Sequence, residues 1–165
     1  MNDRIRFFLN WEEYFAAQEF LRRIRYPIAP EKILGGGLTL LAVLWNFFSG
    51  LTPFSAVPLA AGLAAMFGAP QLRRWASKRK WEREPLYQAE HTVSVSEEGI
   101  HFLMGRVESN LDWGYYQRMV ESPGGFLLVC GHDAFNFFPK RAFGGESVIN
   151  EFRALAAKKI RRHSQ

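Results

Sequence analysis

One stretch of the chain limits its possible folds more than any other feature. The run from Ile33 to Leu72 contains no Asp, Glu, Lys or Arg. A single helix of that length would be about 60 Å long, roughly twice the apolar thickness of a bilayer, so the run has to turn. Ser49–Pro53 supplies turn residues, with Thr52 placed to cap a helix that begins with proline. We expect two apolar helices, short but adequate to cross a membrane, at about residues 33–48 and 53–72.

Two alternatives to a membrane hairpin are less consistent with the sequence. A buried hairpin in a soluble protein would need a domain able to cover two helices that are apolar all round. A cleavable signal peptide has a shorter apolar core and would not follow a segment, residues 1–32, that includes eleven charged side chains. The single cysteine, Cys130, also excludes an internal disulfide framework. We therefore predict an integral membrane protein with a two-helix transmembrane hairpin.

The second apolar segment, residues 53–72, is richer in Ala and Gly than the first. Small residues recur there at every fourth position and define a helix-packing stripe: Ala56, Ala60, Ala64 and Gly68. Small side chains let helix backbones approach closely in lipid. The stripe is therefore predicted to face the first helix near Gly36 and Gly37, or else a partner protein. The alternative is that it reflects composition alone.

Charge predicts the orientation of the hairpin. A basic cluster with no acidic residue follows the second apolar helix and equals the whole net charge of +5: Arg73, Arg74, Lys78, Arg79 and Lys80. Basic residues also precede the first helix, at Arg22, Arg23, Arg25 and Lys32. The turn between the helices carries no charge. Because Lys and Arg are retained on the cytoplasmic side, both termini are expected in the cytoplasm, at a bacterial inner membrane or another energy-transducing membrane.

Aromatic residues lie where a membrane interface is expected. Trp75 and Trp81 on one side, and Trp45 with Phe54 on the other, would form interfacial belts. The basic cluster beside the first pair has three possible roles: it fixes topology only, it also contacts anionic lipid head groups, or it binds nucleic acid. Topology alone is the simplest of these, and nucleic acid is not among the partners we predict.

The segment before the first apolar helix, residues 1–32, is expected to be a cytoplasmic strand and helix. Residues 4–9 begin with alternating polar and apolar side chains, which predicts a short strand. Residues 11–25 have apolar positions at helical spacing, with Asn10 as a suitable N-cap. Two prolines are expected to end this amphipathic helix: Pro27 and Pro30.

After a basic helical extension or linker at residues 73–85, the apolar pattern shifts toward a period of two. Residues 86–165 predict six strands, at 87–96, 100–106, 107–113, 115–121, 126–130 and 134–138. A closing amphipathic helix is expected at residues 146–162. An antiparallel meander capped by one helix resembles a pleckstrin-homology-like domain, and the N-terminal strand is expected to join its sheet. The predicted fold class is thus an α+β membrane protein.

Three short segments of the chain resemble the bacterial YcxB-like family: Asp112–Trp113, Phe126–Val129 and Phe138–Phe143. The resemblance implies a short N-terminal region, two hydrophobic segments and a small domain. In that domain a Trp-containing strand, a hairpin and a Pro-Lys-Arg-Ala-Phe segment precede a final helix. It supports the fold and topology, but it implies no reaction and supplies no catalytic residues.

The residues that carry this resemblance also have structural roles. Trp113 is expected to fill the core between sheet and helix, and Phe143 to anchor a loop under the closing helix. Pro139 is expected to end the last strand, because proline cannot donate to a β-ladder. Lys140 and Arg141 are candidates to contact lipid phosphates or acidic groups of a partner. The alternative for this pair is a solvated edge.

We find no cluster of residues that predicts catalysis. Cys130 falls in an apolar strand and is expected to be an inert core residue. His91 and His101 could meet across a hairpin, which leaves a metal ion as a minor alternative, and His132–Asp133 is expected to form a polar turn. The uncharged spans also contain no candidate ion carrier. We predict no cofactor, no metal and no enzymatic activity.

The predicted function is that of a non-enzymatic, membrane-anchored binding or scaffold module. It would contact membrane lipids and another membrane protein, as an accessory subunit of a larger membrane complex. The alternatives are an anionic-lipid head-group sensor that uses residues 71–80 with Lys140 and Arg141, and a membrane enzyme with an unrecognised site. Against the sensor, residues 86–165 carry nine basic and nine acidic side chains, so they provide no net attraction for anionic lipid.

Overall fold

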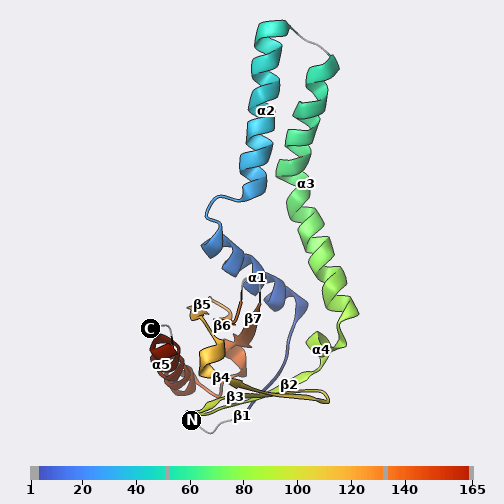
Figure 1. The fold of residues 1–165 in the computed structure, drawn as a ribbon. Helices are drawn as coiled ribbons and strands as arrows, with labels where there is room; N and C mark the ends of the chain where they lie inside the picture. The colour runs from blue at the N-terminus through green and yellow to red at the C-terminus, as the bar shows by residue number, and fades with distance from the viewer. Residues whose placement is uncertain (1–3, 51–52, 132–133, 164–165) are drawn as a thin grey trace. The chain divides into compact units, whose positions relative to one another are not determined.

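A computed structural model describes residues 4–50, 53–131 and 134–163 (Figure 1). The chain divides into two compact units. The hairpin unit is Arg22–Lys80, and the β unit combines Met1–Leu21 with Trp81–Gln165. Antiparallel sheets and a C-terminal helix confirm the α+β class. Two predicted features lie outside the described residues, namely the Thr52 cap and the His132–Asp133 turn.

The described residues form seven strands and five α-helices, with two short 3-10 turns. The strands are β1 (Arg4–Phe8), β2 (Glu90–Val95), β3 (Gly99–Met104), β4 (Val107–Asp112), β5 (Arg118–Glu121), β6 (Gly125–Val129) and β7 (Phe135–Pro139). The helices are α1 (Trp11–Arg25), α2 (Pro30–Ser49), α3 (Pro53–Arg83), α4 (Pro85–Gln88) and α5 (Glu146–His163). The 3-10 turns are η1 (Trp113–Tyr115) and η2 (Lys140–Ala142).

The first sheet of the β unit has four antiparallel strands in the order β1-β2-β3-β4. Ile5 lies opposite Val93, and both side chains point into the core, with 3% and 0% exposed. β1 therefore joins this sheet even though the whole hairpin unit separates it from β2 in the sequence. The prediction that the N-terminal strand completes the sheet is confirmed.

The second sheet has three antiparallel strands in the order β5-β6-β7, and its central strand is buried on both faces. Phe126 and Leu128 of β6 point into the main core, which includes Phe152 of α5. Leu127 and Val129 point the other way, into a second cluster formed with residues of α1. The alternation along β6 thus gives a layered unit, in which α1 covers the face of this sheet opposite the main core (Figure 1).

The two helices of the hairpin unit differ from the predicted ones at their ends. α2 begins at Pro30, not at residue 33, because proline at the first helical position needs no hydrogen-bond partner for its nitrogen. α3 continues without a break through the basic cluster to Arg83, and it contains Pro58 and Pro70 within its length. The predicted second span and much of the predicted linker at residues 73–85 are therefore one helix.

In the β unit the strands are shorter than predicted at two places. Residues 85–88 form a helical turn that begins with proline, so β2 starts at Glu90 and not at residue 87. The chain leaves the first sheet through η1, so β5 begins at Arg118 and not at residue 115. Both differences arise where the backbone changes direction, which a period-two pattern does not encode.

Candidate functional site

The helices α2 and α3 approach closely at two glycines, Gly35 and Gly62. A Cβ placed on Gly35 would lie 2.6 Å from the carbonyl oxygen of Gly62, and one on Gly62 would lie 2.7 Å from that of Gly35. The hydroxyl of Thr39 donates a hydrogen bond to the Gly35 carbonyl at 2.8 Å. Close backbone approach at small residues is the usual way in which helices pack in lipid. We call this contact the glycine seam.

The helix-packing stripe does not form the glycine seam. All four of its residues are exposed or only partly covered, and none of them is buried: Ala56, Ala60, Ala64 and Gly68. Gly36 and Gly37, the expected partners on the first helix, would meet nothing within 4 Å if each carried a Cβ. The prediction that the stripe faces α2 is therefore wrong. At 100° per residue Gly62 lies on the opposite side of α3 from the stripe, so contact through Gly62 turns the stripe outward.

Away from the seam, the hairpin unit exposes large apolar side chains. In the most apolar 18-residue window of α2, only 11% of the residues are buried. Leu41 on α2 is 62% exposed, and Phe67 on α3 is 66% exposed. The core helix of a soluble protein would be mostly buried, whereas exposed apolar surfaces of this kind are typical of sites that contact a membrane or another protein. Among the described residues one helix, α2, is long and apolar enough to cross a membrane, so the second span expected at residues 53–72 stays a prediction.

One residue of the basic cluster belongs to an internal ion-pair network. The carboxylate of Glu31, whose side chain is 12% exposed, lies 2.6 Å from Arg22 and 2.8 Å from Arg73. The other four residues of the cluster remain accessible to solvent: Arg74, Lys78, Arg79 and Lys80. The guanidinium of Arg79 lies 4.9 Å from the centre of the Trp75 ring, which is itself exposed. The basic cluster is therefore linked, through Arg73 and Glu31, to the start of α2.

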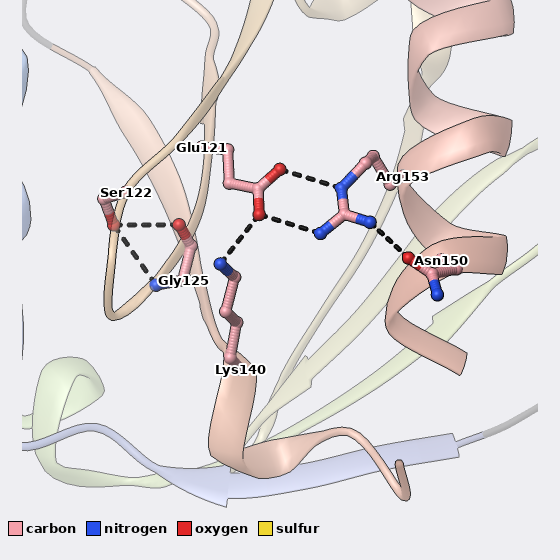
Figure 2. Close-up of polar contacts among 6 residues, drawn as sticks. All are labelled: Glu121, Ser122, Gly125, Lys140, Asn150 and Arg153. Carbon is pink, nitrogen blue, oxygen red and sulfur yellow. Dashed lines mark hydrogen bonds and ion pairs between the residues drawn. The ribbon is translucent and has the colours of Figure 1, made fainter. Parts of the chain in front are cut away.

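Lys140 takes part in an ion-pair network inside the β unit (Figure 2). Its ammonium lies 2.7 Å from Glu121, and Arg153 donates to both oxygens of the same carboxylate, at 2.8 and 2.9 Å. Arg153 also donates to Asn150. Hydrogen bonds from Arg153 and then Lys140 lower the pKa of Glu121 from 4.5 to about 2. The network ties β5 and η2 to α5.

Arg141 connects η2 to the beginning of the chain. Its guanidinium donates to both oxygens of Glu13, at 2.6 and 2.7 Å, and to the carbonyl oxygen of Phe8 at 2.7 Å. The hydrogen bond from Arg141 is the main reason that the pKa of Glu13 is lowered. Glu13 lies in the first turn of α1, where the Asn10 side chain accepts the backbone N–H of Glu12 at 3.1 Å, as expected of an N-cap.

Three other residues of the segments that carry the family resemblance are buried: Trp113, Pro139 and Phe143. Trp113 is 2% exposed, and its indole N–H donates to the carbonyl oxygen of Ser96 at 3.0 Å. Pro139 is the last residue of β7. Phe143 is buried, and its ring lies 5.2 Å from that of Phe152 in α5. The structural roles predicted for Trp113, Pro139 and Phe143 are confirmed.

The residues considered for chemistry lie apart. Cys130 follows β6, so it is not in the strand, and burial raises the pKa of its thiol, which keeps it protonated near neutral pH. His91 lies opposite Met104 in the core, whereas His101 points to the other face and bonds Glu108 at 2.6 Å. The two histidines therefore do not meet. The described part of the chain contains no group of three or more His, Cys, Asp or Glu that could hold a metal ion.

An aromatic cluster in the β unit was not predicted. The Trp81 ring stacks on that of Tyr87 at 5.4 Å and lies 5.2 Å from Tyr14, which also contacts Phe135 at 5.8 Å. Burial, and then the neighbouring Tyr87, raises the pKa of the Tyr14 phenol. Trp81 is 7% exposed, so its predicted place in an interfacial belt is wrong. The four rings of the aromatic cluster come from four separate elements, so no local sequence pattern could have predicted that they meet.

The other predicted belt residues differ among themselves. Trp75 and Trp45 are 56% and 57% exposed, as residues at a membrane interface would be. The side chain of Phe54 lies outside the described part of the structure. One aromatic residue on each predicted side of the hairpin is therefore available to contact an interface.

Together these features define a class: an α+β protein in which an apolar helical hairpin is inserted into a two-sheet unit. Residues 95–156 match the YcxB-like protein family. This span runs from the end of β2 into α5 and contains all three segments that carry the resemblance seen in the sequence. No curated protein and no solved structure matches the chain.

Proposed function

We propose that this protein is a non-enzymatic, membrane-anchored scaffold. A two-span hairpin would hold a pleckstrin-homology-like domain at the cytoplasmic face of the membrane. There the protein would bind another membrane protein, as an accessory subunit of a larger complex. The exposed apolar surface of α2 and α3 supports the anchoring part of this proposal.

The observation that carries the proposal is the pairing of β1 with β2. These strands flank the entire hairpin unit, yet they are hydrogen-bonded neighbours in one sheet. The chain that leaves the β unit after Leu21 must therefore return to the same side of any membrane it enters. If α2 crosses the bilayer, the chain must cross it an even number of times in total, because β1 and β2 have to be on the same side to pair. The return would then be made by α3, which is free of charge from Pro53 to Leu72.

The architecture of the β unit supports the pleckstrin-homology-like assignment. Its described strands form antiparallel sheets of four and three, and one amphipathic helix follows the last strand. The predicted cytoplasmic location of this unit rests on the basic residues that flank both apolar helices. In this arrangement the domain is split, with β1 and α1 before the membrane hairpin and the remaining elements after it.

Two features favour a protein partner over lipid sensing by the β unit. Lys140 forms an ion pair with Glu121 and Arg141 forms one with Glu13, so a lipid phosphate would have to compete with these carboxylates. The helix-packing stripe of α3, defined above, points away from α2 and offers a surface for the close approach of another helix. We therefore place the partner contact on the hairpin and keep the sensor as the alternative.

Cysteine labelling in intact cells tests the topology. In a Cys130→Ser background, Ser49→Cys places a thiol at the hairpin tip and Arg118→Cys places one on the β unit. A membrane-impermeant maleimide should label the first variant only. Labelling of Arg118→Cys before lysis, or release of the chain by alkaline carbonate, would contradict the proposal.

Photo-crosslinking tests the partner. A benzophenone amino acid at Ala60 on the stripe should give one discrete adduct in native membranes. The same amino acid at Leu41, on the exposed face of α2, serves as the matched control and should give mainly lipid adducts. Equal adduct patterns at both positions would contradict a protein contact at the stripe.

A further inference from the structure

Charge is divided very unevenly between the two units. The hairpin unit contains nine Lys and Arg and a single acidic residue, a formal net charge of +8. The β unit contains twelve basic and fifteen acidic side chains, a net charge of −3. The positive charge of the protein thus belongs to the unit that also exposes its apolar side chains.

All nine basic residues lie near one end of the hairpin. They occur only at residues 22–32 and 73–80, and we call them the basic collar: Arg22, Arg23, Arg25, Lys32, Arg73, Arg74, Lys78, Arg79 and Lys80. Glu31 contacts Arg22 and Arg73 at 2.6 and 2.8 Å, which brings the two segments together. Glu31 is the single acidic residue of the hairpin unit, whose formal net charge is therefore +8.

The collar also carries side chains suited to the boundary between lipid and water. Tyr26 and Ile28, in the link between α1 and α2, are 40% and 66% exposed. Trp75 lies between basic residues of α3, with the Arg79 guanidinium stacked over its ring. Because α3 is continuous, its basic turns directly follow its apolar turns. At the end of an apolar helix, Lys and Arg side chains attract anionic phospholipid head groups, and Trp and Tyr rings lie at the head-group level of the bilayer.

We infer that the basic collar binds the head groups of anionic phospholipids. This inference rests on the proposed function, since it requires the hairpin to be in a membrane. It assigns lipid recognition to the hairpin unit and not to Lys140 and Arg141. The phosphodiester would accept hydrogen bonds from the guanidinium and ammonium groups, while Trp75 and Tyr26 contact the glycerol region.

Fluorescence quenching tests the inference on the full chain. The protein is reconstituted in mixed vesicles of phosphatidylcholine and phosphatidylglycerol, in which one lipid or the other carries bromine on its acyl chains. Tryptophan quenching then reports which lipid contacts the hairpin. We expect about fivefold enrichment of phosphatidylglycerol over its bulk fraction. The preference should disappear at about 1 M NaCl, where the Debye length is about 3 Å.

Two variants with equal charge changes make the test specific to the collar. The collar variant replaces four accessible residues by Gln: Arg74, Lys78, Arg79 and Lys80. The control variant replaces four accessible residues of the β unit by Gln: Arg4, Arg6, Arg106 and Arg118. The collar variant should lose the preference, and the control should keep it.

The outcomes separate this inference from the proposed function. If the wild-type chain resists alkaline carbonate but is quenched equally by both brominated lipids, the inference is overturned and the anchor stands. Equal loss of preference in both variants would also overturn it, because net charge rather than the collar would then be responsible. If carbonate releases the chain, the proposed function fails and the inference fails with it.

Discussion

The hairpin unit and the β unit use the same kinds of side chains in opposite ways. In the β unit, Phe126 and Phe152 are fully buried, while charged residues form ion pairs at the surface. In the hairpin unit, Phe47 and Phe48 are 82% and 80% exposed, and the two glycines of the glycine seam form a close internal contact. The comparison teaches that the two units are held together differently. Burial of apolar side chains drives the packing of the β unit, whereas the hairpin unit leaves such side chains exposed and brings two backbones close together.

The largest expected difference between the units comes from truncating a phenylalanine in each. Phe152→Ala removes a side chain that is 0% exposed and contacts three other rings, so it should lower the free energy of unfolding of the β unit by about 3–5 kcal/mol. Phe47→Ala, at an exposed position, should change it by less than about 0.5 kcal/mol. Chemical denaturation of the full chain in detergent measures both. Similar losses of unfolding free energy in the two variants would contradict the conclusion that the two units are held together differently.

The glycine seam provides the next test, because it concerns the hairpin unit alone. Gly62→Leu places a side chain where even a Cβ would lie 2.6 Å from the Thr39 hydroxyl oxygen, so it should separate α2 from α3. We expect a loss of about 1–3 kcal/mol, measured by SDS-induced unfolding from mixed micelles. Gly68→Leu, where a Cβ meets nothing within 4 Å, is the matched control. A larger effect from Gly68→Leu would indicate that the stripe, not the seam, holds the hairpin together.

Glu121 provides a smaller effect that depends on pH. Its folded-state pKa of about 2 lies below the ordinary 4.5, so its contribution to stability is complete above pH 4.5 and is lost as the pH falls toward 2. Because the carboxylate is one-third exposed and screened by solvent, Glu121→Gln should cost only about 1 kcal/mol at neutral pH. Urea denaturation across this range measures the difference between wild type and variant. A difference that stays constant down to pH 2 would exclude the ion pairs as its cause.

The smallest expected effect is at Arg141. Arg141→Lys keeps the charge but loses the two parallel hydrogen bonds to Glu13, which only a guanidinium can make. We expect a loss of about 0.5 kcal/mol and faster amide exchange in β1 and the first turn of α1, measured by hydrogen–deuterium exchange. Unchanged exchange in those segments would show that η2 does not hold the N-terminal strand in place.

The features that could be predicted from sequence are those that repeat along the chain. Alternation along residues 4–8 and 99–112 predicted β1, β3 and β4 to within one or two residues, and helical spacing predicted α1 and α5. The core positions of Trp113 and Phe143 followed from their size and surroundings. Such patterns arise from one face being buried and the other exposed, which is a property of a short segment.

The features that could not be predicted depend on distant partners. Arg141 and Glu13 lie at opposite ends of the chain, so no spacing rule links them, and their pairing was not foreseen. The stripe was expected to face α2 because four small residues share a face, but the observed close approach involves Gly62, a single residue on the other face. Trp81 was expected at the membrane because it is a tryptophan near an apolar run. The rings that it contacts come from elements that only the fold brings together.

The split of the β unit has a consequence for how the protein is made. β1 leaves the ribosome first, but its neighbour β2 is separated from it by the entire hairpin unit. The strand must therefore wait, unpaired, until translation has passed the hairpin and the later strands have emerged. Completion of the sheet then pairs the two strands that flank the hairpin unit. If the hairpin enters a membrane as we propose, β1 and β2 can pair only in chains whose hairpin ends both remain on the same side.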